Sequence, residues 1–512
     1  MKSNVFLLAG LAVIINESVS QEADIVFNYR YYPDTVFEFK PNRLTNAPIQ
    51  DINDLMMMSP NTYQLKGGQM IVDGIPVEDQ KVFIDGMEVD DGNAFPLRSV
   101  GRYRHYKTGQ PVWTGNSAGS IVVVESREFR EKLAYIADGN IDLHDQYQDR
   151  RFEIMLGGPI RFSKEKSGWT PRFLVGATYL QTNDADPSWE DKYIVNEKMQ
   201  KYLAGNPLQR SEHGGTYLNS EFLLRDDFDK IKYHPGAEET TKNYYAKLTF
   251  PIIDGMELTL GRYQNFIDQQ EFIFENTILN AKNNPEIKRN NADSYLNFNH
   301  IINLNSGLNI SYDLNFQYSK YQFSRLDPEH EDRWLEYGYL GKFTTSKQPH
   351  FELDSRFIND SLYENKWFLT GWDDDTAFTF QPLGYNPERA RFSEQIYELF
   401  PNKGDLNGPT GYWRNQNDFL MTGGLLNGMN PGSPYGLWAS QGAFMPGWGI
   451  GDSFNFFYDD LYGYEQNEKY RGTAMAAVKF KNNMVSFGVE YKQKVKRQYS
   501  IDPAGMWNSM RL

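Results

Sequence analysis

The sequence predicts an all-β membrane protein: a transmembrane antiparallel β-barrel that holds an N-terminal plug domain, a small mixed α+β sheet. Three observations carry this prediction. Apolar and polar residues alternate over segments long enough to cross a bilayer, short turns contrast with long polar connections, and a compact segment with continuous apolar runs precedes the alternating strands. At 512 residues the chain is also too long for one compact domain, because single cores stop growing near roughly 250–300 residues.

Composition excludes several other classes of protein. The 67 Asp and Glu outnumber the 52 Lys and Arg, and the resulting net charge of −15 argues against a nucleic-acid partner, which needs a basic surface. Aromatic residues make up 15% of the chain, which is too many for a disordered protein. The mean hydropathy of −0.63 is too polar for a bundle of membrane helices. Cysteine is absent, which excludes disulfide scaffolds and Cys-based metal or redox sites.

Residues 1–20 are predicted to be a signal peptide. The apolar run Val5–Ile15 follows a single charge at Lys2 and precedes the small residues Ser18–Ser20. Its length is typical of a leader and too short to span a bilayer; a buried N-terminal helix is the alternative. No other stretch reaches the roughly 20 apolar residues of a transmembrane helix. The chain is therefore expected to be exported and to cross any membrane with strands.

The clearest strand runs from Leu308 to Ser319. Side chains alternate across a strand, so an apolar residue at every second position gives one apolar and one polar face. The apolar positions are Leu308, Ile310, Tyr312, Leu314, Phe316 and Tyr318. The segment is about as long as a tilted transmembrane strand, whereas most strands of soluble proteins are shorter.

Turns and connections differ in length in a way that indicates a barrel. Asp254-Gly255 and Asn482-Asn483 each join two alternating segments as tight hairpins. In contrast, residues 181–216, 265–292 and 357–471 are expected to form long connections. Compact domains rarely contain structureless loops of that size, but outer-membrane barrels combine short periplasmic turns with long extracellular loops. A bilayer accepts a sheet only as a closed barrel, because an open edge leaves backbone groups unpaired.

Residues 46–130 are expected to form a separate plug domain, preceded by a periplasmic arm at 21–45 and followed by the barrel at 131–512. The runs Val82–Ile84 and Ile121–Val124 are continuously apolar rather than alternating. Continuous runs are typical of strands buried on both faces. A small sheet enclosed by a larger wall would give such strands.

Five segments between residues 52 and 121 resemble, in the right order, the plug of TonB-dependent outer-membrane receptors of the kind abundant in Bacteroidetes. They are Ile52–Asn61, Leu65–Gly68, Phe83–Val89, Phe95–Val100 and Gly109–Ile121. Asn61 stands where the family usually has Gly, and Lys66 where it usually has Arg; Asn tolerates the same positive φ as Gly. Phe152–Pro159 resembles the family's first barrel strand. The resemblance covers roughly residues 46–190, and no preceding β-sandwich domain is found.

The resemblance implies a receptor that takes up a bulky ligand (siderophore, glycan or peptide) through a plugged barrel in the cell outer membrane of a Gram-negative bacterium. Its implied partners are the TonB complex of the inner membrane, outer-membrane lipid and, as a further candidate, a surface lipoprotein. A TonB box is expected at Asp24, Ile25 and Val26. The plug motif is expected to have a structural role and comprises Gly67, Gly68, Ile84, Asp85, Gly86, Gly109, Pro111, Gly115, Asn116 and Gly119.

Barrels of this family have about 22 strands, of which residues 150–512 are expected to supply about half, so the chain is interpreted as a truncated or split receptor. The alternative function is a secreted β-rich carbohydrate-binding surface protein without a membrane span. No enzyme is predicted, because the sequence has no His-Glu-x-x-His pair, no Gly-x-Ser-x-Gly turn and no P-loop. No cofactor, metal site or catalytic residue is expected, and the sequence does not identify the ligand.

Overall fold

The fold was analysed in a computed structural model of the chain. The structure describes residues 8–15, 36–39, 51–65, 70–72, 74–76, 81–90, 95–107, 120–141, 149–161, 170–184, 190–206, 208–210, 216–273, 277–278, 281, 284–304, 308–328, 331, 333, 341–345, 349–372, 378–382, 384, 462–480 and 483–501.

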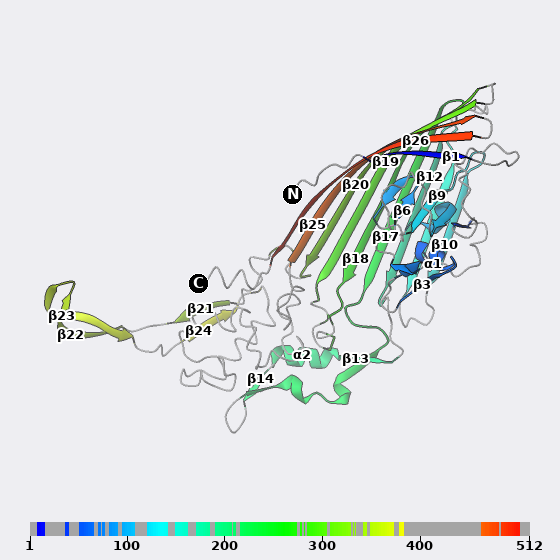
Figure 1. Ribbon diagram of the computed structural model, residues 1–512. Helices are drawn as coiled ribbons and strands as arrows, with labels where there is room; N and C mark the ends of the chain where they lie inside the picture. Colours follow the sequence, from blue (N-terminus) through cyan, green and yellow to red (C-terminus); the bar gives the residue numbers. More distant parts are fainter. Residues whose placement is uncertain are drawn as a thin grey trace.

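The largest element is a ten-stranded antiparallel sheet, which we call the wall (Figure 1). Its strands run in the order β1, β26, β25, β20, β19, β18, β17, β12, β11, β10. Their bounds are Leu8–Ile15 (β1), Ala134–Ile141 (β10), Arg150–Pro159 (β11), Arg172–Thr182 (β12), Glu239–Ile253 (β17), Met256–Gln270 (β18), Glu286–Leu304 (β19), Leu308–Leu326 (β20), Tyr462–Phe480 (β25) and Asn483–Ile501 (β26).

A smaller five-stranded sheet, which we call the small sheet, lies against one face of the wall. Its order is β2 (Val36–Phe39), β8 (Val100–Tyr106), β9 (Ile121–Ser126), β6 (Lys81–Ile84) and β7 (Met87–Val89). Nearby are α1 (Ile52–Met57), the short helix η3 (Leu97–Ser99) and a three-stranded sheet of β3 (Thr62–Gln64), β4 (Met70–Val72) and β5 (Ile75–Pro76). The wall face that contacts the small sheet is called the inner face, and the opposite one the outer face.

The two predicted apolar runs pair as the parallel strands β6 and β9, in register Lys81↔Ile121 to Ile84↔Val124. Ile121, Val122 and Val124 are fully buried, which confirms that these strands are covered on both sides. Asp51 is the N-cap of helix α1, and its carboxylate accepts a hydrogen bond from the Asp54 amide. Asn61 adopts φ 60°, so it takes the left-handed conformation expected at this position.

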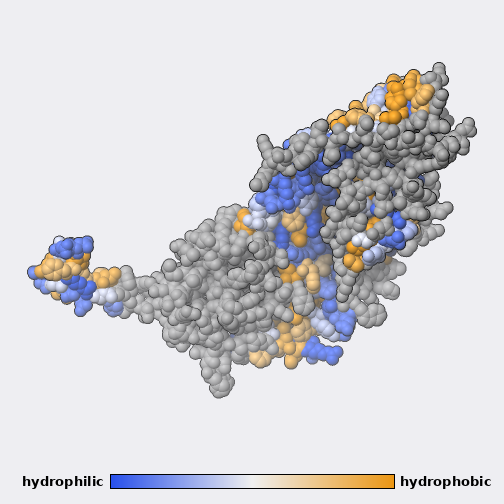
Figure 2. Space-filling model, in the orientation of Figure 1, coloured by the Kyte–Doolittle hydropathy of each residue, from blue (hydrophilic) through white to orange (hydrophobic). Residues whose placement is uncertain are grey.

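The alternating segments form the longest strands of the wall. The segment Leu308–Ser319 lies within β20, and Asp254-Gly255 closes the β17–β18 hairpin with Gly255 at φ 76°. Tyr245, Tyr263 and Tyr295, on three consecutive strands, are buried against the small sheet. Figure 2 shows hydrophilic side chains over much of the inner face beside the small sheet.

Two predicted connections, 265–292 and 357–471, are wrong in their extent. Residues 265–270 and 286–292 continue β18 and β19, which pair as far as Gln270↔Glu286, and residues 462–471 belong to β25. These strand ends mix polar and apolar residues on both faces, so the alternation that marks a strand is lost there. Phe152–Pro159 lies within β11, and β10 directly precedes it in the wall; Asp138, Gly139 and Asn140 of β10 hide its alternating pattern.

The expected connections also contain regular elements of their own. Within 181–238 lie β13 (Lys192–Val195), α2 (Glu197–Gly205), β14 (Leu208–Arg210), β15 (Thr216–Leu218), η5 (Asn219–Phe222), η6 (Arg225–Asp227) and β16 (Phe228–Ile231). Within 327–461 lie β21 (Gly341–Thr345), β22 (Pro349–Ile358), β23 (Ser361–Trp372) and β24 (Phe378–Pro382). Among the described residues, no helix combines the length and apolar character needed to span a membrane.

Two N-terminal segments pair with the sheets. Leu8–Ile15, inside the predicted signal peptide, pairs with β26, and Val36–Phe39, inside the predicted arm, pairs with β8. The signal peptide and the domain boundaries remain predictions.

Candidate functional site at the interface between the small sheet and the wall

The β6–β7 hairpin of the small sheet meets the wall at a two-residue turn. Asp85 adopts φ 48° and Gly86 φ 84°. A turn with positive φ at both central residues matches the twist of a hairpin, and an Asp-Gly pair adopts it readily. The tight turn places the Asp85 carboxylate and the Gly86 carbonyl directly against the inner face of the wall.

The Asp85 carboxylate is the centre of a buried polar cluster. Its Oδ1 accepts from the Ser126 amide at 2.8 Å, and its Oδ2 accepts from the Ser126 hydroxyl at 2.6 Å. From the wall, the hydroxyls of Tyr245 and Tyr295 donate to Oδ2, the latter at 3.3 Å, and the Lys247 ammonium lies 3.4 Å away. One side chain thus joins β9 of the small sheet to β17 and β19 of the wall.

Burial alone would raise the pKa of the Asp85 carboxyl, but its partners outweigh that effect. The Lys247 ammonium and the hydrogen bonds from Ser126 and Tyr245 favour the charged form, and the pKa lies below its ordinary value. The Asp85 carboxylate is therefore ionised at neutral pH, and its contacts with the wall are charge-assisted.

Three cations of the wall converge on the other arm of the hairpin. Lys492 donates to the Glu88 carboxylate, Lys469 donates to the Glu88 carbonyl at 2.9 Å and to Asp90 at 2.8 Å, and the Arg471 guanidinium lies 3.8 Å from Glu88 Oε2. Burial would raise the pKa of Glu88, but Lys492 and Lys469 hold it below its usual value.

The amide side chain of Gln317 pairs with the Glu88 backbone as another strand would. Its Oε1 accepts from the Glu88 amide at 3.0 Å, and its Nε2 donates to the Glu88 carbonyl at 2.8 Å. Arg471 donates to the Gly86 carbonyl at 3.0 Å. A Cβ added at Gly86 would lie 3.2 Å from the Asn315 amide, so the glycine also permits this close approach.

A single row of the wall's register supplies most of these contacts. Lys247 pairs with Gly261, Gly261 with Tyr295, Tyr295 with Gln317, Gln317 with Arg471 and Arg471 with Lys492. We call these six residues the inner row. At Gly261, an added Cβ would lie 2.0 Å from the Tyr295 ring, so the glycine leaves room for the tyrosine that reaches Asp85.

A second anchor has the opposite polarity. Arg98 of the small sheet's η3 segment binds Asp138 of β10 through Nε at 3.0 Å, and its amide donates to Glu153 of β11 at 2.6 Å. Arg151 donates to the other oxygen of Glu153 at 2.7 Å. The Asp138 side chain is 37% exposed, so this anchor is more open to water than the Asp85 cluster.

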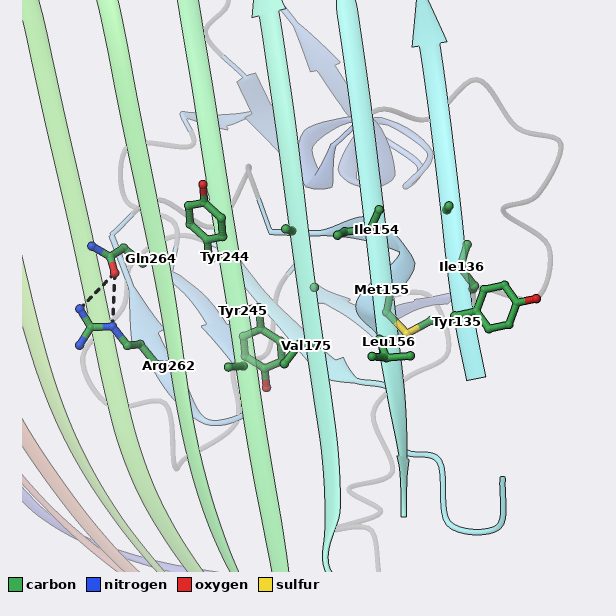
Figure 3. A pocket seen from close by; sticks show the side chains of 14 residues that line it. Tyr135, Ile136, Ile154, Met155, Leu156, Val175, Tyr244, Tyr245, Arg262 and Gln264 are labelled. Carbon is green, nitrogen blue, oxygen red and sulfur yellow. Dashed lines mark hydrogen bonds between the residues drawn. The ribbon is translucent and has the colours of Figure 1, made fainter. Parts of the chain in front are cut away.

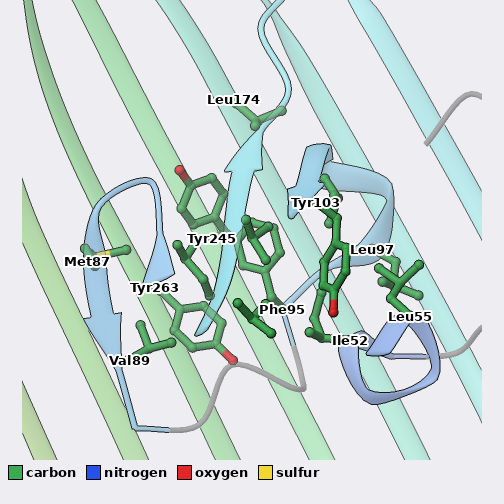
Figure 4. Close-up of a cluster of buried hydrophobic side chains, with 14 of the residues drawn as sticks. Ile52, Leu55, Met87, Val89, Phe95, Leu97, Tyr103, Leu174, Tyr245 and Tyr263 are labelled. Atoms are coloured by element: carbon green, nitrogen blue, oxygen red, sulfur yellow. The ribbon is translucent and has the colours of Figure 1, made fainter. Parts of the chain in front are cut away.

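Apolar side chains of the small sheet and the wall also pack against one another in a buried cluster (Figure 4). The Phe95 ring lies 4.8 Å from that of Tyr245 and 6.0 Å from that of Tyr263. The backbone of β12 comes so close that a Cβ added at Gly176 would lie 2.3 Å from the Ser99 hydroxyl. The small sheet is thus packed on the wall as well as hydrogen-bonded to it.

Only part of the predicted plug motif can be placed. Ile84 is buried in the core, Asp85 is the centre of the polar cluster, and Gly86 makes the turn. The motif residues Gly67, Gly68, Gly109, Pro111, Gly115, Asn116 and Gly119 lie outside the described residues, as do Asp24, Ile25 and Val26 of the expected TonB box.

The sequence alone did not single out the cations of the wall. Lys469 and Arg471 are 3% and 5% exposed. They occupy alternate positions in β25, and inward-facing cations on a strand would have been a usable signal. Among the described residues, no group of three or more potential ligand side chains could hold a metal ion.

Comparison with known proteins gives neighbours at the level of structure. No family model matches the sequence, and no curated protein matches it. The structure is similar to the pyoverdine outer membrane receptor FpvA from Pseudomonas aeruginosa PAO1, with 10% identity, a TM-score of 0.41, and coverage of 91% of this chain and 48% of that chain. It is also similar to the ferric-catecholate import receptor Fiu from E. coli K12, with 8% identity, a TM-score of 0.43, and coverage of 91% of this chain and 60% of that chain. Similarity to the copper transporter OprC has 9% identity, a TM-score of 0.43, and coverage of 97% of this chain and 51% of that chain.

The chain spans about half to three-fifths of the length of these neighbours. Its own topology confirms the predicted fold class: mostly strands, with a small mixed α+β unit on the inner face of an antiparallel wall. The wall is an incomplete barrel within the described residues, since β10 and β1 form its edges and do not pair with each other.

Proposed function

We propose that the protein is a TonB-dependent outer-membrane receptor that takes up a bulky ligand such as a siderophore, glycan or peptide. The wall crosses the outer membrane, and the small sheet is its plug. TonB engages the N-terminal arm and pulls on the plug, and the protein transports rather than catalyses. The plug-like motifs of residues 52–121 support this proposal, and they also suggest the Bacteroidetes type of receptor.

The observation that carries the membrane assignment is an apolar row on the outer face. Leu248 pairs with Leu260, Leu260 with Leu296, Leu296 with Phe316, Phe316 with Gly472 and Gly472 with Tyr491. We call these six residues the outer row. Leu248, Leu260, Leu296 and Phe316 are 38%, 41%, 37% and 58% exposed. A continuous apolar surface of this kind is typical of contact with lipid or a partner.

Membrane fractionation tests the location. The full-length protein should stay in the outer membrane through an alkaline carbonate wash, and its gel mobility should change on heating. Release into the soluble fraction would contradict the proposal and favour a secreted carbohydrate-binding protein. Leu296→Arg should reduce insertion, because an arginine on a lipid-facing barrel position costs about 2–4 kcal/mol at the bilayer midplane. Asn299→Arg, on the inner side of the same strand beside Asp313, is the matched control.

TonB coupling needs a separate experiment. Because the natural chain has no cysteine, a single Ile25→Cys substitution gives an unambiguous cross-linking site. A disulfide in cells to a cysteine-bearing TonB would support the expected box at Asp24–Val26, with Glu22→Cys as a nearby control. Equal cross-linking at both positions would argue against a specific box. Co-purification of a surface lipoprotein would in turn test that further partner.

A further inference from the structure

A groove of about 610 Å³ lies on the outer face of the wall, away from the small sheet (Figure 3). It crosses the five strands β10, β11, β12, β17 and β18. Its volume is within the range of about 300–1,000 Å³ that is common for small-molecule sites. None of the contacts between the small sheet and the wall described above uses its outward-facing side chains.

Small residues make the floor of the groove, and large ones make its sides. Ala177 and Ala246 lie in the floor, with Ile154, Val175 and Tyr244 beside them. The register alternates these sizes: Ile154 pairs with Ala177, Ala177 with Tyr244, and Val175 with Ala246. Ile154, Val175 and Tyr244 are 60%, 40% and 49% exposed. The groove is thus an apolar depression in a surface that is itself apolar.

One end of the groove carries a cation. Arg262 and Gln264 of β18 line it there, and Arg262 Nη2 donates to the Gln264 side chain at 3.1 Å. Its Nη1 lies 3.5 Å from the Ser294 hydroxyl. No carboxylate of the described part of the chain lies within ion-pair distance of Arg262. Arg262 Nε also donates to Gln264 at 3.4 Å, so three of the five donors of the guanidinium fork are used and two remain for an anion.

The groove follows one register row of the wall, just inside a border of aromatic rings. Outward-facing aromatic rings border the apolar part of the wall on the side of the long connections: Tyr179, Tyr244 and Phe266 across β12, β17 and β18. Arg262 and Gln264 lie two and one alternate positions from Phe266 along β18, close to this border. Tyr135, at the opposite end on β10, lies in the same register row as Arg262, joined to it through Leu156, Val175 and Ala246.

We propose that this groove binds a phosphate-bearing membrane lipid, with an acyl chain over Ala177 and Ala246 and its phosphate at Arg262. The proposal rests on the proposed function, because it requires the outer face to lie in a bilayer. Charge complementarity selects this occupant: at one end a guanidinium without a carboxylate partner among the described residues favours an anion, and the rest of the lining is mainly apolar. A protein partner that covered the groove would instead have to supply a buried carboxylate to pair with the Arg262 guanidinium.

Native mass spectrometry of the delipidated full-length protein in detergent tests the proposal. Phosphatidylglycerol should be retained more strongly than diacylglycerol with the same chains. Arg262→Gln should weaken phosphatidylglycerol retention roughly tenfold, the effect of one charged hydrogen bond, and should leave diacylglycerol unchanged. Ala177→Trp should fill the groove and weaken both lipids.

Two outward-facing positions elsewhere on the wall provide matched controls. Lys320→Gln removes a cation of β20, and Ala476→Trp adds the same bulk on β25, where Ala476 is exposed. Neither should change retention. If the controls weaken retention as much as the groove variants, or if phosphatidylglycerol and diacylglycerol bind equally, the groove is not a specific site. Carbonate extraction of the same proteins separates this failure from failure of the membrane assignment: a variant that remains in the membrane but shows no selective retention contradicts the groove alone.

Discussion

The inner and outer rows of the wall are neighbours along every strand, yet their chemistry is opposite. Lys247, Tyr295 and Arg471 of the inner row hold the β6–β7 hairpin, whereas Leu248, Leu296 and Gly472, one residue away on the same strands, belong to the apolar outer row. A strand presents successive side chains to opposite faces, so two sets of requirements can be met by one segment of sequence. Each row of this wall therefore has its own residue requirements.

The largest loss of stability is expected when the buried contact between Asp85 and Lys247 of the inner row is broken. Asp85→Asn keeps a side chain that tolerates positive φ but leaves the Lys247 ammonium without its counter-charge. Breaking a buried pair from one side costs about 3 kcal/mol or more. Hydrogen exchange should show that the opening free energy of the β6 and β9 amides falls by about the same amount. In the Asp85→Asn, Lys247→Met double variant the loss should be smaller than the sum of the single losses, and additive losses would contradict direct coupling.

Two glycines in the same strand register sharpen the comparison. Gly261→Ala in the inner row would place a Cβ against the Tyr295 ring and should cost about 1–3 kcal/mol of stability. Gly472→Ala in the outer row meets no atom closer than 3.8 Å and should be nearly neutral. Denaturation of the two variants in the same detergent measures the difference. A similar loss in both would show that glycine is required in these strands for a reason other than the Tyr295 contact.

A smaller effect is expected at the second anchor. Arg98→Gln removes the ion pair with Asp138, which is partly open to water and is therefore worth about 1 kcal/mol or less. Salt should weaken this contribution, whereas the buried Asp85 cluster should respond little to salt. Hydrogen exchange of the η3 segment at low and high salt measures both. An Arg98→Gln loss that is large and independent of salt would reverse the assigned ranking of the two anchors.

Moderate acid is expected to have the smallest effect. The pKa values of Asp85 and Glu88 are depressed in the folded protein, so their contribution is fully present above the unfolded values of about 4 and is lost as pH falls through the folded values. Opening of β6 should be unchanged between pH 7 and 5 and should increase below about pH 4. The Asp85→Asn, Glu88→Gln double variant should show a weaker dependence. An increase already at pH 6 would point to other groups.

The strands of the wall could be predicted from the sequence only where their inner and outer faces differ in polarity. In Leu308–Tyr318 the outer face is apolar and the inner face polar, so the alternation is visible. Beyond the apolar zone the outer face becomes polar, as at Asn290 and Gln322, and the strand continues without the alternating signal. The Asp85-Gly86 turn was predictable because its conformation is local.

The partners of that turn were not predictable, because they depend on register between distant segments. Asp85 and Tyr295 are 210 residues apart, and Glu88 and Lys492 are 404 apart. Nothing local distinguishes Lys469 or Arg471 from a solvated cation. Only the alignment of β17 to β26 brings the six residues of the inner row onto one line.

A nitroxide scan along β20 tests the central claim, that one face of the wall contacts lipid while the other holds the small sheet. Single cysteines from Leu314 to Tyr318, introduced into the cysteine-free chain in liposomes, would be labelled and their collision rates with oxygen and with a polar nickel reagent measured. Labels at 314, 316 and 318 should collide mainly with oxygen, and labels at 315 and 317 should be strongly immobilised and shielded from both reagents. Equal access of the nickel reagent to all five positions would contradict the account.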